Sequence, residues 1–101
     1  MYQGNQQGGG DFVRVRTPRG REVFGIVEAG LGGSRFKVNC FDEKDRVCRI
    51  PGSIKRDIWV KAGDLVLIEP WVVESDEKGD IVFRYTRTQV DLLRRKGLVK
   101  I

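Results

Sequence analysis

Between residues 22 and 85 the apolar residues fall in short runs, and a turn rich in glycine, proline or aspartate separates each run from the next. Runs of about four to eight residues with alternating or β-branched character predict strands. A chain of 101 residues has room for only one core. The closely spaced turns therefore predict a small closed barrel, built from five strands at residues 23–27, 35–41, 46–50, 65–68 and 81–85.

The clearest pair of strands flanks a polar turn around Lys44. Apolar and polar residues alternate upstream of the turn, so one face is apolar and the other is basic. A hairpin centred on Lys44 places Val38 opposite Ile50 and Cys40 opposite Cys48, which matches apolar with apolar residues. We expect both cysteines to be reduced core residues, with a cross-strand disulfide as the alternative.

The second half of the chain supplies a buried strand and a helix, which decide the predicted fold class. Residues 65–68 are apolar on both faces, which is typical of a strand inside a barrel. From Thr86 to Lys96 the apolar period becomes helical, and Gly97 fits a helix end. The order predicts an all-β fold, a five-stranded OB-fold Greek-key barrel, with an SH3-like barrel as the alternative. We expect a flexible tail at residues 1–12, the barrel at 13–86 and a C-terminal α-helix at 87–101.

Missing residue types limit the chemistry. The chain has no histidine and two cysteines, which excludes a Ser-His-Asp triad, histidine metal ligands and a four-cysteine zinc site. Most carboxylates lie in predicted turns, where they usually form local hydrogen bonds. The longest apolar run is too short to cross a bilayer, and no secretion signal opens the chain. We expect a cytoplasmic, monomeric protein that is not an enzyme and binds no metal, cofactor or membrane.

The net charge of +5 is unevenly distributed along the chain. Residues 14–61 carry a net charge of +6, residues 64–80 carry −5, and residues 84–101 carry +5. Such blocks predict a two-sided molecule with one basic side that can bind phosphate.

Basic and aromatic residues gather around the second and third predicted strands. On an OB barrel these strands form the usual oligonucleotide surface, where cations neutralise phosphates and aromatic side chains stack on bases. For Trp59 two roles stay open, a plug at the end of the barrel or a contact with RNA. The candidate RNA-binding residues are Arg35, Lys37 and Arg49 on the strands, and Lys55, Arg56, Trp59 and Lys61 in the connection that follows.

Several spaced motifs cover most of the chain, from Glu22 to Gly97. They are Leu31–Arg35, Val47–Gly52, Asp57–Val60, Gly63–Val66, Lys78–Ile81, Arg84–Thr86, Thr88–Asp91 and Arg95–Gly97. In type and in order these motifs resemble the translation initiation factor 1A family in its archaeal form.

The resemblance implies an OB barrel that binds the decoding (A) site of the small ribosomal subunit during start-codon selection. It also implies action with initiation factors 1 and 2, support of initiator-tRNA recruitment, and no cofactor or catalysis. The implied rRNA contacts are the seven candidate residues above. A general single-stranded nucleic-acid binder of the cold-shock type is the alternative function. A third reading is a protein-interaction module that docks a partner through the helix at 88–96.

Overall fold

The computed structural model describes residues 15–52 and 59–101. The predicted N-terminal tail and the candidates Lys55 and Arg56 lie outside the described residues. The described residues form two compact units: residues 18–87 make up one, and residues 15–17 together with 88–101 make up the other.

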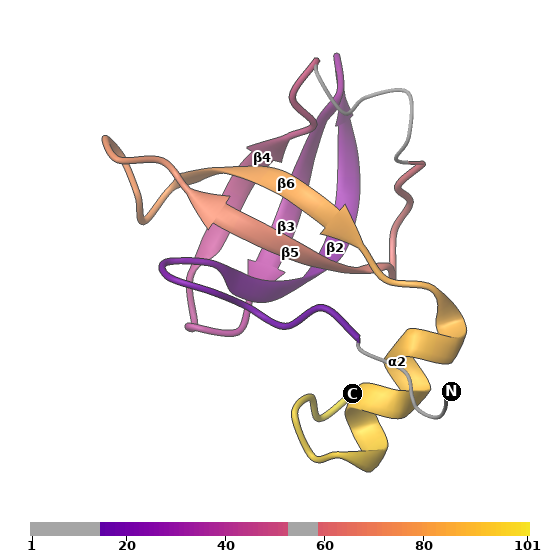
Figure 1. Ribbon diagram of the computed structural model, residues 1–101. Coiled ribbons are helices and arrows are strands. Elements are labelled where there is room, and N and C mark those ends of the chain that lie inside the picture. Colours follow the sequence, from indigo (N-terminus) through magenta and orange to yellow (C-terminus); the bar gives the residue numbers. More distant parts are fainter. Residues whose placement is uncertain (1–14, 53–58) are drawn as a thin grey trace. The chain divides into compact units, whose positions relative to one another are not determined.

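Residues 18–87 form a closed five-stranded barrel (Figure 1). Neighbouring strands pair in the order β2-β3-β4-β6-β5, and β5 pairs back with β2. All pairs are antiparallel except β4 with β6, which is parallel and therefore requires a crossover connection. The strand order confirms the predicted OB-fold Greek-key barrel. The strands are β2 Val23–Gly32, β3 Arg35–Cys40, β4 Asp45–Arg49, β5 Leu65–Pro70 and β6 Lys78–Arg84.

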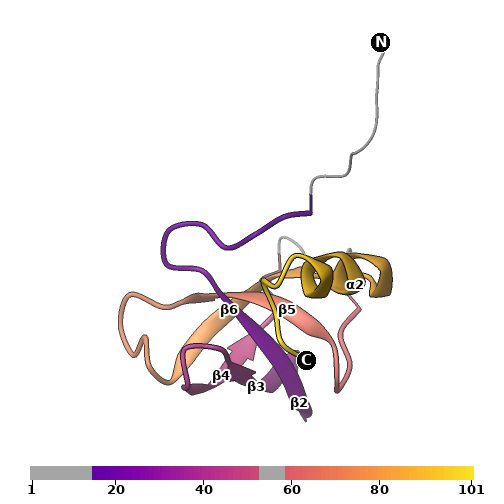
Figure 2. The ribbon, with the colours of Figure 1, turned by 90° about the horizontal axis from the view of Figure 1, so that it is seen from below.

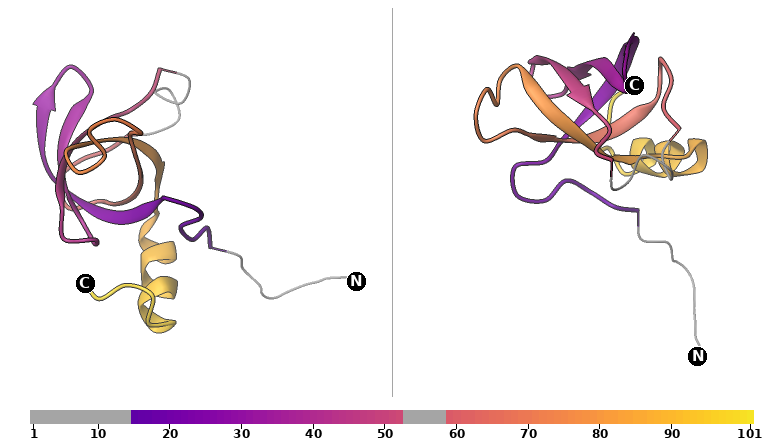
Figure 3. Two further views of the ribbon diagram at one scale, coloured as in Figure 1. Left: turned by 90° about the vertical axis from the view of Figure 1, so that its left-hand side faces the viewer. Right: turned by 90° about the horizontal axis from the view of Figure 1, so that it is seen from above.

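The strands curl into a ring, as the left view of Figure 3 shows, and the connection between β5 and β6 projects beyond their ends (Figures 1 and 2). The ring encloses a cluster of small and β-branched side chains. Gly25 and Gly79 make this close packing possible. A Cβ on Gly25 would lie 2.5 Å from Val38 Cγ1, and one on Gly79 would lie 2.6 Å from Ile68 Cγ2. The core cluster consists of Val27, Val38, Cys40, Cys48, Ile50, Val66, Ile68 and Ile81.

The β3–β4 hairpin has a different register from the predicted one. Val38 lies opposite Arg46, and Phe36 lies opposite Cys48, so Cys40 does not face Cys48 directly. The reason is a tighter turn: Glu43 adopts a positive φ of 68°, and the Cys40 N–H donates to the Lys44 carbonyl at 3.0 Å. The predicted faces are correct, because the hairpin is centred two residues earlier and the alternation is unchanged.

Both cysteines are free and buried in the barrel. A hydrogen bond with Cys40 and burial both raise the pKa of Cys48 above its ordinary value. The Cys48 thiol therefore stays protonated and packs as a small apolar group, as expected for a reduced core residue.

After the last strand the chain forms helix α2, Arg87–Arg95. Leu93 is its buried residue, and Arg94 and Arg95 place positive charge in the last turn, where the helix dipole favours it. Gly97, with a φ of 74°, ends the helix as predicted. Its N–H donates to the Arg94 carbonyl and the Leu98 N–H donates to the Leu93 carbonyl, which together form a Schellman cap. In the part of the chain that the structure describes, no helix is long and apolar enough to cross a membrane.

Candidate nucleic-acid interface

Strands β3 and β4 present a basic outer face. Side chains alternate along a strand, so Arg35, Lys37 and Arg49 point away from the core that holds Val38 and Cys48. Arg35 and Arg49 are direct cross-strand partners, and both are exposed. Like charges in this position repel each other. An anion bound at this face would reduce that repulsion.

The two arginines differ in what surrounds them. Arg49 Nε donates to Asp80 Oδ1 at 3.1 Å, and its guanidinium carbon lies 5.1 Å from the centroid of the Trp71 ring. Arg35 has no ion-pair partner among residues 15–52 and 59–101. Arg35 is thus the strand cation whose charge is most available to a phosphate.

Lys37 lies two residues beyond Arg35 on the same outer face of β3. Its Nζ is 3.7 Å from Glu28 Oε1, and both side chains are about half exposed, at 45% and 46%. Exposed pairs of this kind contribute little to stability. Lys37 can therefore exchange Glu28 for a phosphate at small cost.

Trp59 and Lys61 lie on the connection that leads into β5. Between them, Val60 packs against the barrel core, which turns its two neighbours outward. The Trp59 side chain is 84% exposed, so the barrel-plug alternative is wrong for this residue. An indole with this exposed fraction is available for stacking on an unpaired base. Lys61 is also exposed, and its backbone N–H donates to Asp64 at 2.9 Å.

The sequence reasoning missed a polar group at the edge of this face. Trp71 Nε1 donates to Asp80 Oδ1 at 2.8 Å, and that oxygen also accepts from Arg49. The group forms because β6 pairs in parallel with β4 and places Asp80 beside Arg49. The sequence signal was a tryptophan and an aspartate on either side of one predicted hairpin loop.

No cluster of three or more cysteine, aspartate or glutamate side chains is placed to hold a metal ion within the described ranges. The closed five-stranded barrel places the chain in the class of OB-fold proteins, a fold that binds oligonucleotides or oligosaccharides in many of its members.

The sequence assigns the chain to one family within that class. Residues 10–101 match the family described as "Translation initiation factor 1A / IF-1". The chain belongs to this family, which confirms the predicted resemblance.

Curated relatives support this assignment. The chain is 52% identical over 91 residues to translation initiation factor 1A of Pyrococcus abyssi. The matched region covers 90% of this chain and 80% of that protein. It is 53% identical over 90 residues to the protein of the same name from Methanococcus maripaludis strain C5, with 87% of each chain covered. These archaeal relatives are named as initiation factors and not as enzymes.

A solved structure supports the fold. The solution structure of translation initiation factor 1 from the Wolbachia endosymbiont of Brugia malayi has a TM-score of 0.52 and 33% sequence identity with this chain. The match covers 66% of this chain and 79% of that one.

Proposed function

We propose that the protein binds the decoding (A) site of the small ribosomal subunit, where it supports initiator-tRNA recruitment and start-codon selection. The observation that carries the proposal is the exposed pair Arg35 and Arg49 on the outer face of β3 and β4. It carries this weight because the chain belongs to the translation initiation factor 1A family. The site is in the cytoplasm, where the protein works as a monomer with initiation factors 1 and 2, without a cofactor and without catalysis.

In this proposal the strand cations bind rRNA phosphates and Trp59 stacks on an unpaired base. The free charge of Arg35 supports the first role, and the 84% exposure of Trp59 supports the second. Lys61 extends the basic surface toward β5. Lys55 and Arg56 complete the proposed contacts on sequence grounds alone.

The test is co-sedimentation of the protein with purified archaeal small subunits, over a salt titration and with excess short single-stranded RNA as competitor. Stoichiometric binding that survives the competitor supports the proposal. Binding that the competitor abolishes favours the general single-stranded nucleic-acid binder. Binding that is indifferent to salt favours the protein-interaction module.

The variant for this test is Arg35→Glu, with Arg19→Glu as the matched control. Both arginines are exposed residues of the barrel unit, and the charge change is the same. We expect Arg35→Glu to weaken subunit binding and to reduce the log-log salt slope by about 0.7 per lost phosphate contact. Equal effects of the two variants would remove the β3–β4 face from the proposal.

A further inference from the structure

The loop between β5 and β6 displays two exposed apolar side chains. Val72 is 86% exposed and Val73 is 73% exposed. Adjacent valines that are this exposed bury little apolar surface in the barrel and therefore add little to its stability. They follow Trp71, which is half-buried, so three apolar residues stand in succession at the start of the loop.

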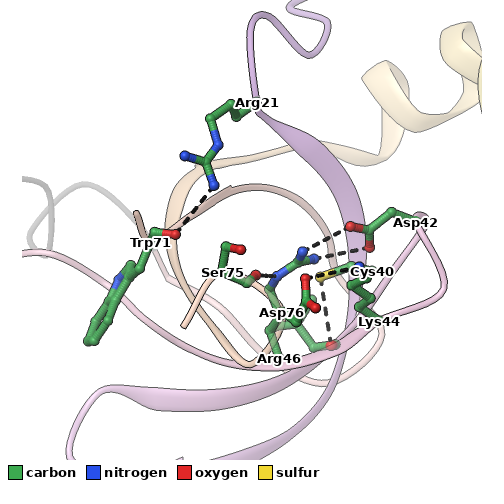
Figure 4. A network of polar contacts seen from close by, with 9 residues as sticks. Arg21, Cys40, Asp42, Lys44, Arg46, Trp71, Ser75 and Asp76 are labelled. Carbon is green, nitrogen blue, oxygen red and sulfur yellow. Dashed lines mark hydrogen bonds and ion pairs between the residues drawn. The ribbon is translucent and has the colours of Figure 1, made fainter. Parts of the chain in front are cut away.

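This loop is held firmly to the barrel (Figure 4). Arg21 donates to the Trp71 carbonyl at 3.4 Å, and Arg46 donates to the Ser75 carbonyl. Lys44 binds Asp76 at 2.9 Å. The valines are therefore presented by a fixed support, which lowers the entropy cost of binding a partner there.

A shallow hollow of about 390 Å³ has Val72 in its lining. Its lining combines two carboxylates with the apolar side chains of Pro70, Trp71 and Val72. Glu69 and Asp80 are cross-strand partners in it, an arrangement in which like charges repel. Arg49 compensates Asp80, whereas Glu69 has no ion-pair partner among the residues that the structure describes. The hollow is lined by Arg49, Glu69, Pro70, Trp71, Val72 and Asp80.

We infer that this surface, the hollow at Glu69 together with Val72 and Val73, docks a protein segment that carries a lysine or arginine beside an apolar residue. The basic side chain fills the hollow and pairs with Glu69, while the apolar residue covers the valines. Charge favours a basic protein segment over RNA, because the lining of the hollow holds two carboxylates, Glu69 and Asp80, against the single cation Arg49. Arg49 marks the border between this surface and the basic β3–β4 face.

The inference rests on the proposed function, since it places the partner on the small subunit. The test introduces a benzophenone amino acid at position 73, binds the protein to purified small subunits, and irradiates the complex. We expect a cross-link to a ribosomal protein, within a segment that contains lysine or arginine. A cross-link to rRNA, or none in complexes that co-sediment, would overturn the inference.

A second variant tests the charge. Glu69→Lys should weaken subunit binding by about threefold or more, as expected for loss of a partly exposed ion pair. Glu43→Lys is the control, because Glu43 is also an exposed glutamate of the barrel and the charge change is equal. If RNA faced the hollow, Glu69→Lys would instead bind more tightly than Glu43→Lys.

The two proposals fail in different ways. A protein that does not bind small subunits at all contradicts the proposed function, and the docking inference falls with it. A protein that binds subunits but cross-links to rRNA at position 73 contradicts the docking inference alone.

Discussion

Arg46 forms a bidentate ion pair with Asp42, in which Nη1 donates to Oδ1 at 3.0 Å and Nη2 donates to Oδ2 at 2.9 Å. Only 3% of the Arg46 side chain is exposed. Its Nε donates to the Ser75 carbonyl, so the guanidinium joins the β3–β4 turn to the β5–β6 loop (Figure 4). A buried cation in this position depends on its carboxylate for stability.

The first prediction is that Asp42→Asn destabilises the protein by about 2 kcal/mol, because it leaves the Arg46 charge buried without its counter-charge. Urea unfolding followed by circular dichroism measures the change. Glu43→Gln is the control, since Glu43 is exposed in the same turn and should unfold like the unmodified protein. Equal stability of the two variants would show that Asp42 is not needed to compensate Arg46.

The second prediction concerns pH. Hydrogen bonds from Arg46 hold the pKa of Asp42 below its ordinary value. A carboxyl whose pKa is lower in the folded than in the unfolded protein stabilises the fold above the unfolded pKa. That contribution is lost as the pH falls through the folded pKa. The free energy of unfolding should therefore fall with decreasing pH below about 4, and it should fall less in Asp42→Asn. Parallel pH profiles would contradict this.

The third prediction concerns the closeness of the barrel walls. Gly25→Ala would place a Cβ 2.5 Å from Val38 Cγ1 in the core, which forces side chains or backbone to move. We expect a loss of about 1–3 kcal/mol, as for other overpacked cores. Gly30→Ala, on the same strand, is the control, because its Cβ would meet Phe36 at an ordinary 3.7 Å. Similar urea midpoints for the two variants would contradict the prediction.

The alternation of apolar and polar residues was enough to predict which faces of the β3–β4 hairpin point inward, but not its register. A shift of the hairpin centre by two residues preserves the faces and changes every cross-strand partner. The turn decided the register, through the left-handed backbone of Glu43 and the hydrogen bonds from Arg46 to Asp42. Alternation puts position 46 on the inward face with Cys48, but an arginine can be buried there only because Asp42 compensates its charge. That carboxylate is recognisable as its partner only once the turn is known.

Local pattern likewise identified Arg35, Lys37 and Arg49 as neighbours on one face, and the structure brings them together there. It did not identify the contacts of Arg49 with Asp80 and Trp71. Those depend on the parallel pairing of β4 with β6, which joins residues about thirty positions apart. Period-two alternation carries no information on such pairings.

The last prediction separates binding from folding at Trp59. Its side chain is 84% exposed, so Trp59→Ala should leave the urea midpoint unchanged. If the indole stacks on a base in the bound state, its loss should weaken small-subunit binding by about tenfold, within the range of one stacking contact. Trp59→Phe should retain most of the affinity, because a phenyl ring also stacks. Trp71→Ala gives the contrasting case: it removes the hydrogen bond to Asp80 and should lower stability as well. If Trp59→Ala lowers the urea midpoint, the indole packs on the protein. If the variant binds small subunits with full affinity, Trp59 lies outside the interface. The interface then depends on Arg35 and Lys37 without an aromatic contact.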